Sequence, residues 1–329
     1  MAEELFHALG AAPGLRIERD VPLARHTTWR IGGAAEALVE VHTERALRRL
    51  LTLLHAEQVP THLLGLGSNV LIPDEGLPGA VLRLAGGFLR YRVWGRRVTA
   101  GGGIPLPRLA RAMAVRGLVG IEALTGFPST VGGAVNMNAG CYGTEIADVL
   151  VAATVVDRAG ARRRVGVAEL EPGYRSTRLQ GSGDIVSRAT LELAAGDAEA
   201  AEARIRELNA RRRLSLPGGL PNAGSTFKNP PGDYAGRLIE AAGLKGAAQG
   251  GARISPRHAN VIVNEDGARA ADVLSLMLRA YQEVEERFGV RLEPEVVLAG
   301  SLAVLWREGT ETLGYTANER SLEKKGDME

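Results

Sequence analysis

Apolar residues along the chain follow both the helical and the strand period, which predicts a mixed fold. Residues 270–288 place apolar side chains on one helical face, ending at Phe288, and Gly289 follows as a C-terminal cap. After Thr43, which can cap a helix, four leucines recur on one face: Leu47, Leu50, Leu51 and Leu54. Shorter helices are predicted over 105–118, 197–213 and 233–242.

Short apolar runs bounded by glycine and proline predict strands between these helices. They fall over 36–41, 61–72 (strand, turn and strand), 80–84, 91–100, 149–157, 163–167, 184–193, 260–264 and 296–303. Strands and helices do not alternate regularly, and the chain has neither a G-x-G-x-x-G nor a Walker motif. The pattern therefore predicts the α+β class rather than a doubly wound sheet, with a linker over 214–224.

Composition narrows the class of protein without naming a function. A chain of 329 residues is long enough for two or three domains. Its 40 basic and 38 acidic residues nearly balance and aromatics make up 4%, so neither nucleic acid nor a membrane surface is an expected partner. The lone cysteine, Cys141, excludes a disulfide framework and a cysteine-based metal site, and we interpret it as a packing residue.

Neither a signal peptide nor a membrane span is predicted. The first ten residues lack the basic-then-apolar order of a signal peptide. The longest uncharged run, 123–144, contains five glycines and predicts a loop system. We therefore expect a soluble, cytoplasmic protein, with a frayed lead-in over 1–14 and a disordered polar tail over 314–329.

Two glycine-rich segments are candidates for holding a ligand. GLGSN (65–69) lies between two predicted strands, and successive amides in such a turn can converge on a phosphate. Residues 124–143 form a long loop without helical or strand period. Its apolar anchors argue against disorder: Phe127, Val131, Val135 and Met137. This loop is either a ligand cradle or an irregular structural crossover.

The stretch PNAGSTFKNP (221–230) is the strongest candidate for acid–base chemistry. Ser225 follows a flexible Ala-Gly pair and precedes Lys228 and Asn229. One interpretation is a surface turn, for which this composition is typical. The other is a serine that exchanges a proton while Lys228 and Asn229 hold an anionic substrate.

Two charged residues in separate segments have similar alternatives. Arg175, in GYRSTR, either clamps a carboxylate or is a surface arginine. Glu295, in LEPEVVLAG, either acts as an acid or hydrogen-bond orienter or caps a neighbouring element. Neither segment by itself decides between the two interpretations of its charged residue.

In this order and spacing, the motifs resemble those of the UDP-N-acetylenolpyruvoylglucosamine reductase family, over roughly residues 25 to 300. The resemblance is carried by HTTWRIGG (26–33), GLGSN (65–69), GFPSTVGGAVNMNAGCYG (126–143), GYR (173–175), NAGSTFKNP (222–230), SPRHANVIVN (255–264) and LEPEV (292–296). Two glycine loops, a serine loop and a terminal EPEV are highly specific in combination.

The resemblance implies an FAD-binding fold of the vanillyl-alcohol-oxidase (PCMH) type with a smaller α+β substrate-binding domain. The implied divisions are FAD-binding subdomains over 15–80 and 81–213, a substrate-binding domain over 214–300, and a C-terminal strand and polar tail over 301–329. The short spacing from Arg175 to Ser225 is similar to that of the compact subclass, which lacks an extra substrate loop.

The activity implied is the NADPH-dependent reduction of UDP-N-acetylglucosamine enolpyruvate to UDP-N-acetylmuramate, for peptidoglycan precursor synthesis. Non-covalent FAD would pass hydride from N5 to C3 of the enolpyruvyl group, and Ser225 would give the proton to C2. Arg175 and Glu295 would hold and polarise the substrate carboxylate. The implied partners are this substrate and NADPH, with no nucleic acid, metal or membrane insertion, in a monomer or weak dimer.

Further contacts are implied residue by residue. Those expected to contact FAD are Arg30, Gly65, Leu66, Gly67, Ser68, Asn69, Thr125, Gly126, Pro128, Ser129, Gly132, Gly133, Asn138 and Gly140. Those expected to bind substrate are Tyr174, Arg213, Gly224, Lys228, Asn229, His258 and Asn260. The segment around Trp29 is expected to line the adenine or diphosphate end of FAD.

One departure from the family keeps two other functions open. Members carry a lysine shortly before the serine loop, where this chain offers Arg213 or Ser215. Another FAD-dependent oxidase or dehydrogenase of the same fold would need no Ser225, Arg175 and Glu295. A non-catalytic nucleotide-sugar binding protein is favoured by the missing lysine and disfavoured by that trio.

Overall fold

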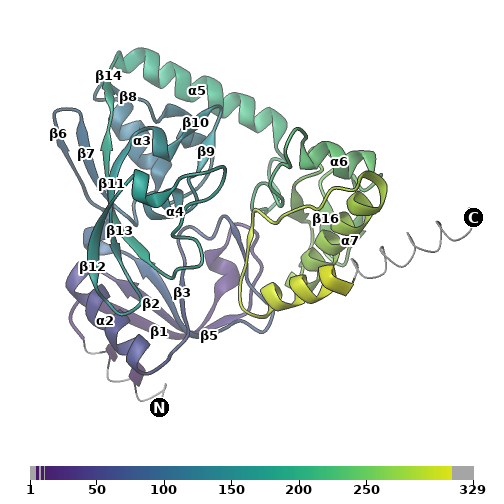
Figure 1. Ribbon diagram of the computed structural model, residues 1–329, viewed down its shortest axis with the longest axis horizontal. Coiled ribbons are helices and arrows are strands. Elements are labelled where there is room, and N and C mark those ends of the chain that lie inside the picture. The colour runs from purple at the N-terminus through teal and green to yellow at the C-terminus, as the bar shows by residue number, and fades with distance from the viewer. Residues whose placement is uncertain (1–4, 7–8, 11, 313–329) are drawn as a thin grey trace, which may run out of the picture. The chain divides into compact units, whose positions relative to one another are not determined.

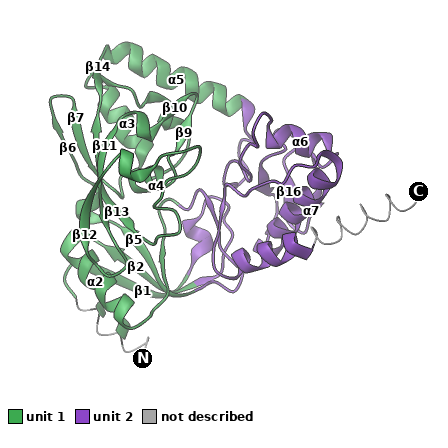
Figure 2. Ribbon diagram, in the orientation of Figure 1, with its two compact units in different colours: residues 1–21, 35–66, 78–214 green, residues 22–34, 67–77, 215–329 purple. Residues whose placement is uncertain are grey.

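The chain folds into two compact units, coloured separately in Figure 2. The computed structural model describes residues 5–6, 9–10 and 12–312, so the tail predicted over 314–329 and part of the predicted lead-in lie outside the described residues. Unit 1 comprises residues 1–21, 35–66 and 78–214, and unit 2 comprises residues 22–34, 67–77 and 215–329. Unit 2 therefore takes two short segments from within the sequence span of unit 1.

The first layer of unit 1 is a four-stranded sheet covered by helix α2 (Figure 1). Its strands run in the order β1 (Leu15–Pro22), β2 (Ala34–Val41), β5 (Leu77–Leu84) and β3 (Thr61–Leu63). The four predicted leucines of α2 (Glu44–Ala56) are buried in the same core as the β2 and β5 side chains. The predicted cap is confirmed, because the Ala46 amide donates to Thr43 Oγ1 at 3.2 Å.

A five-stranded antiparallel sheet forms the second layer of unit 1. Its order is β12 (Arg162–Gly166), β11 (Leu150–Val156), β13 (Ile185–Glu192), β7 (Arg97–Gly101) and β6 (Tyr91–Trp94). Successive side chains of a strand point to opposite faces. The face with Val98 and Ala189 is packed against helices α3 (Leu106–Ala114) and α4 (Val131–Asn136).

Shorter elements complete unit 1. Two small ladders pair β8 (Leu118–Val119) with β14 (Ala194–Ala195) and β9 (Gly140–Cys141) with β10 (Thr144–Glu145). The 3-10 turns are η2 (Gly86–Leu89), η3 (Glu122–Gly126), η4 (Ile146–Asp148) and η5 (Ala168–Leu170). Helix α5 (Ala198–Ser215) ends the unit, and Asp197 Oδ1 accepts the Ala200 amide at 2.7 Å as its N-cap.

Unit 2 packs helices and a small sheet around an apolar core that includes Trp29, Phe227 and Tyr281. Its elements are η1 (Leu23–His26), α6 (Ala235–Ala241), β15 (Ala248–Gln249), β16 (Ala252–Ile254), β17 (Ile262–Asn264) and α7 (Ala270–Phe288). Strand β4 (Val70–Leu71) pairs in parallel with β18 (Val297–Leu298). Trp29, from one of the inserted segments, is 1% exposed in this core, and its indole donates to the Ile262 carbonyl at 2.8 Å.

Several predicted elements are confirmed, and others are corrected. Helix α7 has the predicted bounds, and Gly289 caps it with φ +66°. The strand predicted over 296–303 is wrong, because β18 holds only Val297–Leu298 and residues 301–312 are helical. Phe288, the last apolar residue on the predicted face of this helix, is 39% exposed. The predicted loop over 124–143 contains α4, a helix too short for its period to be recognised.

Candidate functional site

The serine loop is fixed by hydrogen bonds to two distant segments of unit 2. Gly224 has φ +75°, and no atom beyond its chain neighbours lies within 4 Å of the place that a Cβ would take, so the loop turns there beside open space. The next amides are tied down, since Thr226 N donates to the Asn260 carbonyl at 2.8 Å and Phe227 N donates to Asn260 Oδ1 at 2.9 Å. Ser225, which is half-buried, lies between the open turn and this fixed backbone.

The Glu295 segment is joined to the same loop. Glu295 N donates to the Thr226 carbonyl at 2.8 Å, and Lys228 N donates to the Glu293 carbonyl at 2.8 Å. The Glu295 carbonyl in turn accepts from Asn69 Nδ2 at 3.0 Å. Glu295 is therefore hydrogen-bonded to Thr226, the residue that follows Ser225. The backbone thus brings two residues predicted to be catalytic into neighbouring positions.

Asn260, predicted to bind substrate, uses its side chain on the protein itself. Its Nδ2 donates to the Phe227 carbonyl at 2.8 Å, while its Oδ1 accepts from the Phe227 amide. It is 3% exposed. The asparagine therefore positions the serine loop, a role that a motif in sequence does not reveal.

Other predicted substrate residues of unit 2 also have protein partners. Lys228 Nζ lies 3.3 Å from Glu293 Oε2, and Asn229 Oδ1 accepts the Ala235 amide at 3.1 Å, which caps α6. His258 Nδ1 accepts the Asn260 amide at 3.3 Å. Each of these three residues therefore makes a contact within unit 2.

The segment around Trp29 belongs to the core of unit 2. The Thr28 amide donates to the Gly67 carbonyl at 2.9 Å. A Cβ at Gly67 would lie 2.0 Å from the His26 carbonyl oxygen, so only glycine permits this approach. Arg30 is exposed with φ +56°, whereas Trp29 is buried. Of this segment, Arg30 offers a side chain to a ligand and Trp29 is an anchor.

In unit 1, Gly65 of the first predicted glycine loop lies against the second predicted loop. A Cβ at Gly65 would lie 3.1 Å from Thr130 Oγ1, the N-cap of α4, whose hydroxyl accepts the Gly133 amide at 3.1 Å. A Cβ at Gly133 would crowd the Ser129 and Thr130 hydroxyls at 3.3 and 3.2 Å. The amides of Ser129 and Thr130 donate to no other described residue. Free amides beside small residues at a helix start suit a diphosphate.

Asn138 fastens the second glycine loop to the turn that carries Arg175. It is 1% exposed, and its Nδ2 donates to Glu145 Oε2 at 2.6 Å and to the Gly173 carbonyl at 3.0 Å. Arg175 follows with φ +53°, its guanidinium 5.3 Å from the centre of the Tyr174 ring. Arg175 belongs to unit 1, and Ser225 and Glu295 belong to unit 2.

The end of α5 contacts the glycine loop through a residue that sequence reasoning missed. Arg212 Nη1 lies 3.5 Å from Cys141 Sγ, and its Cδ lies 3.4 Å from where a Gly126 Cβ would be. Its neighbour Arg213, the predicted substrate residue, is exposed. The helical period could have distinguished Arg212 from Arg213, because consecutive residues of a helix point in different directions.

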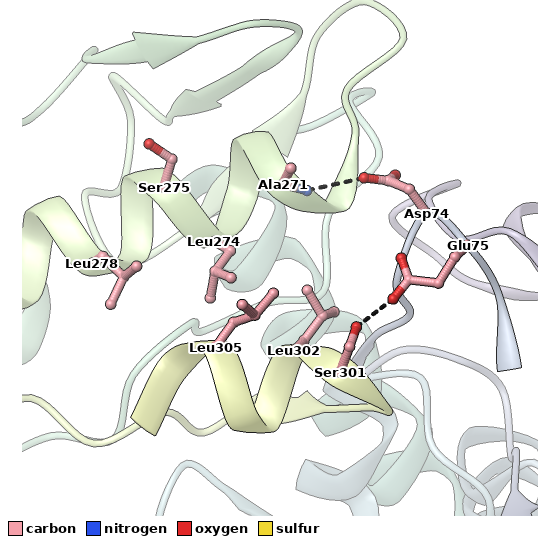
Figure 3. Close-up of a pocket in the computed structure, with 9 residues that line it drawn as sticks. All are labelled: Asp74, Glu75, Ala271, Leu274, Ser275, Leu278, Ser301, Leu302 and Leu305. Carbon is pink, nitrogen blue, oxygen red and sulfur yellow. Dashed lines mark hydrogen bonds between the residues drawn. The ribbon is translucent and has the colours of Figure 1, made fainter. Parts of the chain in front are cut away.

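One hollow of unit 2 is lined by none of the predicted site residues. It measures about 290 Å³, between α7 and the helix over 301–312, with Asp74 and Glu75 at one end (Figure 3). Asp74 accepts the Ala270 amide at 2.8 Å, and Glu75 accepts the Ser301 hydroxyl, which lowers the pKa of the Glu75 carboxyl. Both carboxylates therefore accept a hydrogen bond from the first residue of a helix: Asp74 from α7, and Glu75 from the helix over 301–312.

Comparison with known proteins identifies the family. An FAD binding domain model matches residues 35–166, and a model of the C-terminal domain of UDP-N-acetylenolpyruvoylglucosamine reductase matches residues 216–299. UDP-N-acetylenolpyruvoylglucosamine reductase 2 of Symbiobacterium thermophilum is 50% identical over 300 residues, which cover 91% of this chain and 97% of that protein. The chain belongs to the UDP-N-acetylenolpyruvoylglucosamine reductase family.

Other members and a solved structure agree with this assignment. The family member of Heliobacterium modesticaldum is 44% identical over 280 residues, which cover 85% of this chain and 89% of that protein. The crystal structure of the family member from Thermus caldophilus matches with a TM-score of 0.76 and 42% identity, over 87% of this chain and all of that chain (100%). The α+β FAD-binding class expected from the sequence is confirmed.

Two kinds of feature are absent from the described residues. Over residues 5–6, 9–10 and 12–312, no three His, Cys, Asp or Glu side chains gather as metal ligands. Within the same ranges, no helix combines the length and apolarity that crossing a bilayer requires.

Proposed function

We propose that this chain reduces the enolpyruvyl group of UDP-N-acetylglucosamine enolpyruvate to give UDP-N-acetylmuramate, with FAD as cofactor and NADPH as the electron source. Family membership supports the reaction, and the ladder that joins the serine loop to the Glu295 segment carries the assignment of roles. FAD would supply the transfer of hydride from NADPH to the substrate when bound. The remaining steps fall to side chains of this chain.

Ser225 is the proposed proton donor to C2. The open turn at Gly224 leaves room beside it, and the hydrogen bonds to Asn260 hold the following backbone still. A serine hydroxyl is a weak acid, so its effectiveness rests on correct placement and on a relay that restores its proton.

Arg175 and Glu295 are the proposed partners of the substrate carboxylate. As hydride reaches C3, negative charge grows on C2 and the carboxylate, and a fixed donor such as a guanidinium stabilises it. Removing one donor of this kind typically costs about 3–4 kcal/mol of barrier. Tyr174, Lys228 and Asn229 are the proposed contacts of the nucleotide sugar.

The FAD contacts proposed for unit 1 centre on the paired glycine loops. The free amides of Ser129 and Thr130 and the glycines around them would hold the diphosphate. Gly65, Gly126 and Asn138 would shape the same cradle. We further propose a cytoplasmic location and a monomer or weak dimer.

Anaerobic stopped-flow spectroscopy tests these roles. The purified protein is reduced with NADPH and then mixed with the enolpyruvyl substrate, following flavin absorbance. We expect Ser225→Ala to be reduced normally by NADPH but to be reoxidised by substrate at least about 100-fold more slowly, because general acid catalysis supplies that much.

Ser275→Ala is the matched control, since Ser275 is an exposed serine on α7 of the same unit. It should behave as wild type in both half-reactions. Reoxidation only by oxygen would favour an oxidase of the same fold, and absence of bound flavin would favour a binding protein. Equal reoxidation rates in Ser225→Ala and wild type would remove Ser225 from the chemistry while leaving the reductase assignment intact.

A further inference from the structure

The outer face of the five-stranded sheet in unit 1 is lined with arginines. Strand pairing places Trp94 opposite Arg97 and places Arg97 opposite Glu192 on the next strand. Four residues before Glu192 on β13, Arg188 lies opposite Thr154 of β11, which lies opposite Arg164 of β12. Neighbouring strands are about 4.8 Å apart, so this face extends roughly 19 Å from β6 to β12.

Most of this positive charge is not neutralised. Glu192 is the one carboxylate in the five strands, and it lies 2.9 Å from Arg97 and 3.6 Å from Arg96. Arg92, Arg164 and Arg188 are exposed and form no ion pair with any described residue. The near balance of 40 basic and 38 acidic residues in the whole chain conceals this local excess.

The surface continues onto helix α2. Arg162 of β12 pairs with Glu44 at 2.8 Å, and Arg48 Nε donates to the Gly160 carbonyl at 3.0 Å in the turn beside it. Arg45 and Arg49, on the same helix, are exposed and line a hollow with Arg48. In Figure 1, α2 and β12 lie side by side in unit 1, so the basic residues of the strand and of the helix belong to neighbouring elements.

Trp94 is the most exposed large apolar side chain of the described residues. It is 88% exposed, in the β6–β7 hairpin, which forms an edge of the sheet in Figure 1. Its neighbour Val93 is also exposed, at 36%, whereas Tyr91 turns inward and packs on the core. An indole in water with arginines on either side is typical of residues that lie at a membrane interface.

We propose that this face, with Trp94 at its edge, docks on the anionic phospholipid surface of a bilayer. Arginines spread over a sheet face complement a uniform layer of phosphate headgroups, and each contributes attraction near such a surface. The indole would insert at headgroup depth. A single-stranded nucleic acid is the weaker match, because its bases need several stacking rings and this face presents one. The association is peripheral and reversible, beyond the catalytic function.

Vesicle flotation of the full-length protein with bound FAD tests the proposal. Vesicles of phosphatidylcholine alone are compared with vesicles containing about 30% phosphatidylglycerol, at low and high salt. We expect binding only to the anionic vesicles, weakening with salt as the Debye length shortens. Emission of Trp94 should shift to shorter wavelength on binding, and Trp94→Phe should lose that shift. Neutralising each arginine should weaken partitioning about fivefold.

The decisive variant is Arg92→Gln with Arg188→Gln, for which about 25-fold weaker partitioning is expected. Its matched control is Arg204→Gln with Arg206→Gln, two exposed arginines on α5. Flavin content equal to wild type checks folding in each variant. The proposal would be overturned by equal losses in both double variants or by equal binding to both kinds of vesicle. Binding to DNA or polyglutamate without binding to vesicles would also overturn it.

Discussion

At the scale of single residues, the serine loop depends on one buried asparagine. Asn260 satisfies both the amide and the carbonyl of Phe227 with its side chain, and its own carbonyl accepts the Thr226 amide. Buried backbone groups without partners are costly, so the asparagine stabilises the loop as well as placing Ser225.

We predict that Asn260→Ala lowers the free energy of unfolding by about 2–4 kcal/mol, because two buried backbone groups lose their partners. Urea unfolding measures this loss. Reoxidation by substrate should slow in the same variant while flavin reduction by NADPH persists. Gln282→Ala, at a half-buried site on α7 where the side chain makes an exposed hydrogen bond to Glu286, is the control and should stay within about 0.5 kcal/mol of wild type. A wild-type unfolding curve for Asn260→Ala would contradict this account of the loop.

Thr226, next to Ser225, is buried with a hydroxyl that has no partner among the described residues. We predict that Thr226→Val is neutral or stabilising by up to about 1 kcal/mol, since it removes an unsatisfied polar group. Thr177→Val is the contrast, because Thr177 Oγ1 donates to the Asn136 carbonyl at 2.6 Å and its loss should cost about 1–3 kcal/mol. Thermal unfolding of the pair decides, and destabilisation of equal size in both would refute the distinction.

At the scale of elements, the end of α5 contacts the glycine-rich loop over 124–143. Arg212 contacts Cys141, and Asn209 Nδ2 donates to Thr125 Oγ1 at 3.3 Å one turn earlier. The helix thereby supports a loop from which several FAD contacts are proposed. Arginine at this end also suits the helix dipole.

We predict that Arg212→Ala weakens FAD binding about 10-fold or more, because the loop loses its support at Gly126 and Cys141. Fluorescence titration of the apoprotein with FAD measures this affinity. Arg213→Ala should leave FAD affinity within about twofold and raise KM for the nucleotide sugar if Arg213 takes the place of the family lysine. The opposite pattern would exchange the roles of the two arginines.

Strand β3 carries a histidine that makes stability depend on pH. Burial lowers the pKa of His62 from 6.5, against a smaller opposing hydrogen bond with the backbone of Pro78, and its Nε2 has no partner among the described residues. The unfolded chain therefore binds this proton more readily than the folded chain. Stability from this residue is complete above about pH 6.5 and falls as the pH drops below it.

We predict that His62→Gln flattens the decrease in unfolding free energy between about pH 7.5 and pH 5, since glutamine does not titrate. Urea unfolding at several pH values measures the slope. A variant as pH-sensitive as wild type over that interval would show that other groups control the dependence.

At the scale of the whole molecule, unit 2 is discontinuous in sequence. Trp29 and Leu71 come from its two inserted segments, yet they share a core with Phe227, Ile262 and Met277. A chain that ends at residue 214 lacks the last segment of unit 2. The side chains of Trp29 and Leu71 would then be exposed to water.

We predict that a fragment of residues 1–214 exposes Trp29. With Trp94→Phe, Trp29 is the single tryptophan of that fragment, and its emission should resemble that of an indole in water and be quenched readily by acrylamide. The full chain with Trp94→Phe and Trp306→Phe is the comparison, in which Trp29 is 1% exposed. Buried-type emission from the fragment would mean that the segment finds other cover.

Much of the molecule could be predicted because its signals are local. The leucine spacing of α2, the cap at Thr43 and the glycine after α7 each depend on residues a few positions apart. The start of the helix over 301–312 is predicted wrongly as strand because a short apolar run suits either structure, and α4 is shorter than two turns.

By itself, the sequence determined the α+β class, the family and the motifs that contain Ser225, Arg175 and Glu295. Only the tertiary structure decided that Asn260 supports the serine loop, that Arg212 rather than Arg213 contacts the glycine loop, and that arginines of separate strands share one exposed face. The reason is physical. Helix and turn signals depend on neighbours along the chain, whereas strand register and core packing join residues that the sequence keeps far apart.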